Sequence, residues 1–187
     1  MNKELKVMIY TAIGLLLILV VCNNIIHSKK QLYISEGTYA SQTMALNRLR
    51  SPNIRRPSER GKYPSLKHKK GIKVIAVPQN NLLYVLDHRR VLYIAHALIN
   101  FTPRALAVND ARGEKSFHMN NGQGSSAVAW TSIGQDGYLE SPLKVNQHTV
   151  RGNWVKKKYR ILNTIELSKK DAAWLQKLPQ GTGIVIK

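Results

Sequence analysis

The sequence predicts a mainly β domain with one helix near its C-terminus, preceded by an apolar helix at the N-terminus. Three observations carry this prediction. Short segments rich in β-branched and aromatic residues alternate with turn signals in residues 71–187. Only one segment in that range has both the cap and the apolar stripe of a clear helix. Near the start of the chain, a run of 20 residues carries no charge.

The uncharged run, Val7–Ile26, has Asn23 and Asn24 as its only strongly polar members. About 20 apolar residues cross the hydrocarbon core of a bilayer as a helix, so we expect a membrane anchor in residues 1–30 with a transmembrane helix at about 7–26. A cleaved signal peptide and a lipid-modified cysteine are the alternatives. The run lacks a small-x-small cleavage site, and Val21 before Cys22 is too bulky for a lipoprotein signal. An uncleaved anchor is therefore preferred.

The chain is strongly basic. Its 187 residues include 29 Lys and Arg against 10 Asp and Glu, which gives a net charge of +19. Residues 1–30 hold four Lys and one Glu, a net +3, so +16 lies on residues 31–187. Such a surface attracts nucleic acid, anionic lipid head groups, wall polymers or acidic peptides, and composition does not choose among them. Lysines flank both ends of the apolar run, so charge alone does not orient it.

Residues 31–70 connect the anchor to the domain. Five residues there have the spacing of a short amphipathic helix: Tyr39, Met44, Ala45, Leu46 and Leu49. The stretch that follows, Ser51–Gly71, is rich in Pro, Gly, Ser and charge, which is typical of a solvated linker. Adhesion of its basic cluster to an anionic layer is the alternative interpretation. We therefore divide the chain into an anchor at 1–30, a linker or stalk at 31–70 and a domain at 71–187.

The domain begins with three short segments that read as strands. They are IKVIAV at 72–77, LLYVLD at 82–87 and VLYIAHALI at 91–99, with turn signals at 78–81 and 88–90 between them. This spacing predicts antiparallel hairpins. Later strands are expected in AVAWTSI at 127–133 and YRILNTIEL at 159–167, and a closing strand in GIVI after a Gly turn. The helix should begin after Ser168, because Asp171 stands three residues on as in a capping box.

In their order along the chain, these pieces resemble the L,D-transpeptidase family, also called YkuD-like, in its membrane-anchored Gram-positive form. The similar stretches are VIAVPQNNLLYVLDHRRVLYIAHAL, NFTPRA in place of a Thr-Pro-x-Gly turn, residues 112–141 as mid-domain loops, and LSKKDAAWLQKLPQGTGIVI. The resemblance covers roughly residues 55–187. It implies a β-sandwich with one C-terminal helix, a peptidoglycan substrate, and a position outside the cell membrane facing the wall.

The resemblance fails at the catalytic motif, Ser-His-Gly-Cys-Ile/Val-Arg-Leu. Here the matching residues are 161–167, so Thr164 stands at the cysteine and Leu162 at the histidine, while Asn163 replaces the glycine and Glu166 the arginine. The family's second histidine would fall near YLESP, where Glu140 or Ser141 stands. These five positions, with Asn163 set aside, are the vestigial site: Thr164, Leu162, Glu166, Ser141 and Glu140.

These replacements remove the chemistry that the resemblance implies. A cysteine is nucleophilic because part of it is thiolate and because sulfur is intrinsically reactive, whereas a threonine hydroxyl needs a general base within hydrogen-bond reach. Leu162 and Ser141 cannot be that base, and Glu140 suits the role poorly. Glu166 reverses the charge where a substrate carboxylate or oxyanion would be held. Thr164 is then an ordinary β-branched strand residue, although His118 or His148 could approach it in three dimensions.

We therefore expect no catalytic residue, cofactor or metal site. The remaining histidines have no metal-ligand spacing, Cys22 is the only cysteine, and NNGQGSS lacks the helix and lysine of a phosphate loop. The favoured interpretation is a pseudoenzyme that binds peptidoglycan stem peptides or anionic wall polymers, or modulates an active relative. An active transpeptidase with an unusual nucleophile is the alternative. Nucleic acid is not an expected partner, because aromatic and basic residues are not interleaved.

Overall fold

The computed structural model describes residues 2–32, 37–118, 124–142, 144–145, 148–149, 154–156 and 162–187. The chain divides into two compact units, Met1–Ser35 and Glu36–Lys187. Each is described by itself.

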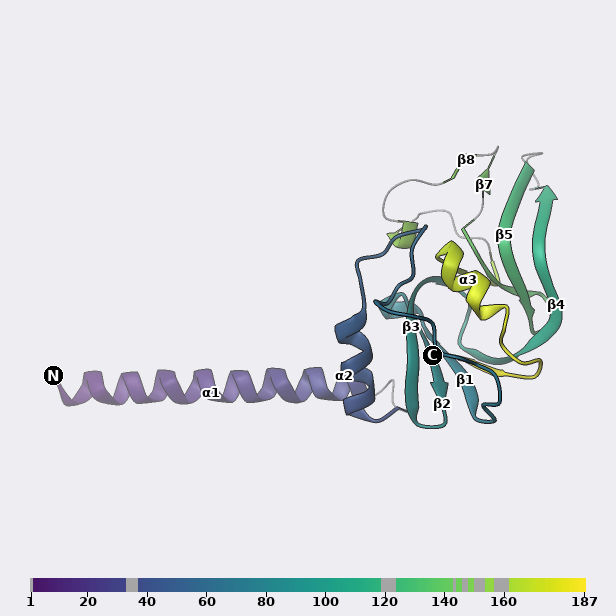
Figure 1. Cartoon of the computed structure of the whole chain (residues 1–187). Helices are drawn as coiled ribbons and strands as arrows, with labels where there is room; N and C mark the ends of the chain where they lie inside the picture. Colours follow the sequence, from purple (N-terminus) through teal and green to yellow (C-terminus); the bar gives the residue numbers. More distant parts are fainter. Residues whose placement is uncertain are drawn as a thin grey trace. The chain divides into compact units, whose positions relative to one another are not determined.

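The first unit is the helix α1, Lys3–Leu32 (Figure 1). Its segment Lys3–Asn23 is long and apolar enough to cross a membrane, and none of that stretch is buried by protein. Its large apolar side chains are exposed along the described part, as at Met8, Leu16 and Leu19. The predicted helix is confirmed, and its insertion in a membrane stays a prediction.

The second unit is built around a closed ring of eight strands. The strand order is β4-β10-β1-β2-β3-β9-β6-β5, and β5 pairs with β4 to close the ring. Two short strands, β7 (Lys144–Val145) and β8 (His148–Thr149), continue from β5. The eight ring strands are β1 (Ile72–Val77), β2 (Leu82–Asp87), β3 (Arg90–Asn100), β4 (Arg104–His118), β5 (Gly124–Ile133), β6 (Gly137–Glu140), β9 (Thr164–Leu167) and β10 (Gly183–Ile186).

The expected sandwich is therefore wrong, and the fold is a barrel. Closure of the barrel depends on β4, whose 15 residues are enough to pair with one strand along its first part and with another along the rest. Its first residues, Arg104–Ala107, pair with β10, and the residues from Val108 to His118 pair with β5. The register shifts beside Gly113, whose φ is +143°, so the strand changes direction there. The range 112–141, which the resemblance assigned to mid-domain loops, contains the end of β4 and all of β5 and β6, and the strand predicted at 127–133 lies within β5.

The hairpins at the start of the domain are confirmed. β1, β2 and β3 pair antiparallel, and the turns between them place Asn81 and His88 at a φ of +53°. Asn and His tolerate this left-handed conformation better than β-branched residues do. Two pairings are parallel, β1 with β10 and β6 with β9. Of the predicted strand at 159–167, the structure assigns Thr164–Leu167 to β9, and residues 159–161 lie outside the described residues.

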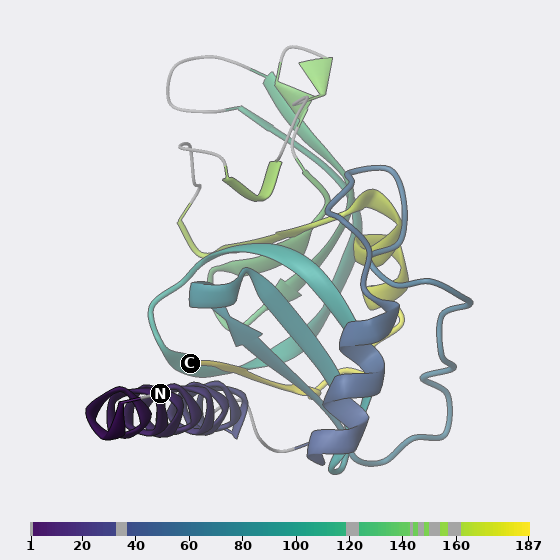
Figure 2. The ribbon, with the colours of Figure 1, turned by 90° about the vertical axis from the view of Figure 1, so that its left-hand side faces the viewer.

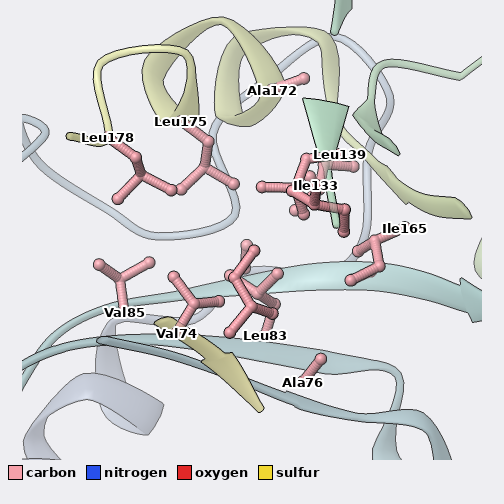
Figure 3. Packing of buried hydrophobic residues seen from close by; sticks show 14 of the residues in the cluster. Val74, Ala76, Leu83, Val85, Ile133, Leu139, Ile165, Ala172, Leu175 and Leu178 are labelled. Atoms are coloured by element: carbon pink, nitrogen blue, oxygen red, sulfur yellow. The ribbon is translucent and has the colours of Figure 1, made fainter. Parts of the chain in front are cut away.

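The core lies between the barrel strands and α3, Lys169–Leu175. Figure 3 shows Ala172, Leu175 and Leu178 pointing from the helix and its end towards inward side chains of the strands, such as Leu83. The predicted cap is present as well, because the Ser168 hydroxyl accepts from the backbone N–H of Asp171 at 3.1 Å. Both the helix and its apolar stripe are thus confirmed.

Residues 37–70 belong to this compact unit, whereas the sequence suggested a solvated linker. α2 (Tyr39–Arg48) forms where the amphipathic pattern predicts it and buries Gln42 and Ala45. Residues 50–70, named here the strap, then run along the side of the unit to β1 (Figure 2). Ser58 and Glu59 in the strap are only 4% and 3% exposed. Hydrogen bonds from Ser58 and Tyr63 to the distant Asp171 hold the strap against the barrel.

Candidate functional site

The candidate site lies on β9, where the sequence resemblance places the catalytic motif of the L,D-transpeptidases. Ile165 and Leu167 belong to the barrel core. Because side chains alternate along a strand, Thr164 and Glu166 lie on the opposite face of the sheet. Both are nevertheless buried, with 3% of each residue exposed. The hydroxyl at the nucleophile position is therefore covered by other protein atoms.

The register of β9 with its neighbours defines what surrounds these two side chains. Thr164 lies opposite Asn100 of β3 and Tyr138 of β6, and Glu166 lies opposite Leu98 and Glu140. The short 3₁₀ helix η2 (Trp154–Lys156) packs on the same face, where Trp154 and Val155 form a small cluster with Leu98. Apolar side chains thus cover the Glu166 end of the pair formed by Thr164 and Glu166 on this face of β9.

Two carboxylates stand side by side on this face. Glu140 and Glu166 are register partners on adjacent parallel strands and are only 1% and 3% exposed. Neighbouring strands are about 4.8 Å apart, so the two side chains extend from backbone positions about that far from each other. A carboxyl group in a dry environment is costly to ionise, and a second carboxyl beside it raises that cost.

The remaining vestigial positions have structural roles or no visible role. Ser141 is fully buried, and its Oγ accepts from the backbone N–H of Val128 at 2.8 Å and of Ala129 at 3.3 Å. This serine joins the end of β6 to β5. Leu162, at the position of the activating histidine, is 78% exposed and offers no titratable group.

Asn163, at the motif's glycine, adopts a left-handed conformation with a φ of +60°. Glycine and asparagine are the residues that most readily adopt this conformation, which explains the exchange. The Asn163 side chain accepts from Arg104 Nη2 at 2.9 Å and donates to Asp136. Its backbone N–H donates to the Asn100 carbonyl at 2.9 Å, and its carbonyl accepts from the Tyr138 N–H at 3.0 Å. The turn before Thr164 is thereby held by four hydrogen bonds.

The two histidines considered as bases lie at element ends, His118 at the end of β4 and His148 at the start of β8. Their side chains lie outside the described residues. His96 is occupied elsewhere, because its Nε2 lies 2.6 Å from the Arg50 carbonyl oxygen. Within the part of the chain that the structure describes, no group of three or more His, Cys, Asp or Glu side chains could hold a metal ion.

A second polar centre, which the sequence did not reveal, surrounds the fully buried Asp171. Its carboxylate accepts from the hydroxyls of Ser58, Ser168, Tyr93 and Tyr63 at 2.6–2.8 Å. The backbone N–H of Ser58 also donates to it at 3.2 Å. Burial, and next the charge of Asp171, raise the pKa of Tyr63 and Tyr93 well above the usual range. Both tyrosines therefore remain protonated donors.

This centre fastens the strap to the barrel. Tyr63 stacks on Trp174 of α3 with ring centroids 5.1 Å apart, and Tyr93 lies 4.8 Å from the same ring. The Trp174 Nε1 donates to the Pro64 carbonyl at 3.2 Å. Nearby, Glu59 accepts from Arg48 Nε at 2.7 Å, and burial raises its pKa despite this pair. The only local sequence signal for the centre is the Ser168–Asp171 cap.

No family model and no curated protein matches the chain. Several solved structures have a similar fold. One is a fused Zn-dependent amidase/peptidase/peptidoglycan-binding domain-containing protein from Clostridium acetobutylicum, with 16% identity, a TM-score of 0.48, and 79% of this chain and 58% of that chain covered. Another is L,D-transpeptidase 1 of Mycobacterium tuberculosis, with 12% identity, a TM-score of 0.47, and 63% and 61% covered. A third is a mutant L,D-transpeptidase of Enterococcus faecium, with 12% identity, a TM-score of 0.49, and 63% of this chain and 50% of that chain covered. The chain thus matches about half to three fifths of the length of these proteins.

Proposed function

We propose that the chain is a membrane-anchored domain of L,D-transpeptidase-like architecture that faces the cell wall, binds peptidoglycan stem peptides or anionic wall polymers, and catalyses no acyl transfer. The observation that carries this proposal is the identity and burial of the residue at the nucleophile position. Thr164 is only 3% exposed at the start of β9. A peptide carbonyl would have to reach this hydroxyl before any transfer could begin.

The neighbours of Thr164 support the same conclusion. Leu162 supplies no base at the position of the family's activating histidine, and a threonine hydroxyl needs a general base to become a strong nucleophile. Glu140 and Glu166 place two carboxylates where acyl transfer requires donors for a developing oxyanion. Asn163, by contrast, keeps the left-handed turn that the motif's glycine would allow. The backbone of the motif is thus retained while its reactive groups are replaced, as expected of a binding domain derived from an enzyme.

The anchor is proposed from α1. Its segment Lys3–Asn23 could span a bilayer, and peptidoglycan lies outside the cell membrane, so a domain that binds it must be on that side. Fractionation and N-terminal sequencing of the mature protein test this point. We expect the full chain in the membrane fraction with residues 1–26 retained. Release into the medium with a new N-terminus would contradict the anchor.

The catalytic test compares the full chain with Thr164→Ala, both purified in neutral detergent and supplied with tetrapeptide muropeptides. The matched control is Thr131→Ala, which alters another fully buried threonine on β5. We expect saturable binding and no cross-linked dimers from any of the three proteins. If the unaltered chain and Thr131→Ala form dimers and Thr164→Ala does not, Thr164 is a working nucleophile and the alternative of an active transpeptidase is correct.

A further inference from the structure

The strap carries a concentration of positive charge that the barrel site does not use. Residues 50–70 hold eight Lys and Arg against one acid, Glu59, a net +7. That one acid is neutralised by Arg48 at 2.7 Å. The strap is therefore the most basic described segment of the second unit, and its charge is held in place by the Asp171 centre.

Two hollows lie along the strap, and one residue, Pro64, lines both. The first, of about 490 Å³, is bordered by Lys67, Lys69 and Lys177. The second, of about 360 Å³, is bordered by exposed basic side chains on both of its sides, Arg60 and Lys62 from the strap and Arg90 from β3. Together the two hollows are named the basic groove.

Most of the cations in the basic groove are available to a ligand. Lys69 is not, because its Nζ lies 2.7 Å from the Asp87 carboxylate. Among the residues that the structure describes, no ion pair is found for Lys67, Lys177, Arg60, Lys62 or Arg90. Five uncompensated charges along two adjoining hollows suit a ligand with repeated negative charge better than a single small anion.

We propose that the basic groove binds a linear polymer that carries phosphate groups along its backbone. Lysine binds phosphate as a point charge and arginine binds it through paired N–H groups, and the groove offers both. A flexible thread can follow two concave hollows, whereas a flat lipid surface cannot enter them. Single-stranded nucleic acid would need exposed aromatic rings for its bases. The aromatic rings here stack on one another, and Trp174 is only 5% exposed.

This proposal rests on the proposed function in one point, the binding of an anionic wall polymer, and it assigns the basic groove as the site that binds the polymer. The probe is fluorescently labelled linear inorganic polyphosphate, added to the full chain in neutral detergent. The test variant Lys62→Gln/Lys67→Gln/Lys177→Gln removes three charges from the basic groove. The matched control Arg55→Gln/Arg89→Gln/Lys187→Gln removes three exposed charges outside the two hollows and leaves the same net charge.

We expect the groove variant to bind polyphosphate about tenfold more weakly, with a shallower dependence of log Kd on log salt, because three phosphate contacts are lost. The control should lose less than about threefold, from its lower net charge alone. Equal losses in the two variants would show that binding follows overall charge and would overturn the site. Unchanged binding in the groove variant would overturn it as well.

Competition identifies the ligand class. Unlabelled polyphosphate should displace the probe at a much lower phosphate concentration than free inorganic phosphate, or than phosphatidylglycerol, an anionic lipid, carried in micelles of the neutral detergent. Equal displacement by the lipid micelles would instead indicate a membrane-binding surface, and stronger displacement by oligo(dT) a nucleic-acid site; either result overturns the proposal. Muropeptides are absent from every arm, so failure here leaves the cross-linking test of the proposed function unaffected.

Discussion

Asp171→Ala should be among the most destabilising single substitutions in the second unit. The carboxylate is fully buried and accepts hydrogen bonds from five donors. Two donors belong to Ser58 and one to Tyr63, both in the strap, and the others to Tyr93 on β3 and to Ser168. Alanine would leave these donors facing a small empty space from which water is largely excluded.

The size of the effect follows from what remains behind. A hydrogen bond to a charged group contributes about 1.5–3 kcal/mol, and each buried donor left without an acceptor costs about 1–3 kcal/mol. These terms do not add fully, since rotating hydroxyls can re-pair, so we expect a loss of about 3–5 kcal/mol in the free energy of unfolding. For a domain of this size that corresponds to a fall in Tm of about 10–15 °C. Asp171→Asn keeps one acceptor oxygen and should lose about half as much.

Thermal and denaturant unfolding of the full chain in neutral detergent measure this, and fluorescence in a Trp130→Phe/Trp154→Phe background gives a local probe, because the remaining Trp174 ring packs against Tyr63 and Tyr93. Limited proteolysis should also cut the Asp171→Ala strap before the barrel, since the centre joins the two. A loss below about 1 kcal/mol, or a strap as resistant as in the unaltered chain, would refute the assignment of Asp171 as the anchor of the strap.

Three further predictions concern other parts of the unit. Burial raises the pKa of Tyr84 to about 12 and the pKa of Tyr63 and Tyr93 beyond the usual range, so the folded state holds these protons more tightly. These protonated tyrosines contribute fully to the free energy of unfolding below about pH 10, and the contribution is lost as the pH rises further. Denaturation midpoints should therefore fall above about pH 10, less steeply in Tyr84→Phe. Midpoints that do not change with pH in this range would contradict the prediction. Asn163→Ala should unfold about 1 kcal/mol more easily than Asn163→Gly, because only the former places a Cβ in the left-handed turn; equal midpoints would count against that strain. Arg112→Lys should cost about 1–2 kcal/mol in urea unfolding, because Arg112 donates to carbonyls at the end of α3 and to the Asn109 carbonyl, and an unchanged midpoint would mean that these bonds contribute little.

The parts of the fold that could be predicted are those with local causes. The β1–β2–β3 hairpins follow from segments rich in β-branched and aromatic residues and from turn residues such as Asn81 and His88, and α3 follows from the cap at Ser168. Barrel closure could not be predicted in this way. It depends on β4, whose polar sequence reads as a loop and which becomes a strand only because β10 and β5 offer edges on both sides.

The same limit applies to the strap and to the site. The composition of residues 51–71 is that of a linker, and its order comes from Asp171, which is 113 residues from Ser58 along the chain. At the site, the sequence places Thr164, Leu162 and Glu166 at the motif positions, and that assignment stays a prediction. The sequence did not indicate that Glu140 would lie beside Glu166, because that contact requires the parallel pairing of β6 with β9. Local patterns thus identified side chains, while long-range pairing determined their neighbours.

Thr164→Cys, finally, should not create a transpeptidase. The new thiol would keep the burial of Thr164, which is 3% exposed, and burial favours the neutral thiol over the reactive thiolate. Leu162 would still supply no base to activate it. Catalytic groups act together, so one restored member should leave dimer formation from muropeptides at the background of Thr164→Ala. Thiol titration by a small alkylating reagent, with Cys22→Ser in the same chain so that only the new thiol reacts, gives an independent measurement, in which we expect slow labelling with an apparent pKa above that of a free cysteine. Rapid labelling at neutral pH together with cross-linking would mean that the site still activates a nucleophile and that only the sulfur had been lost.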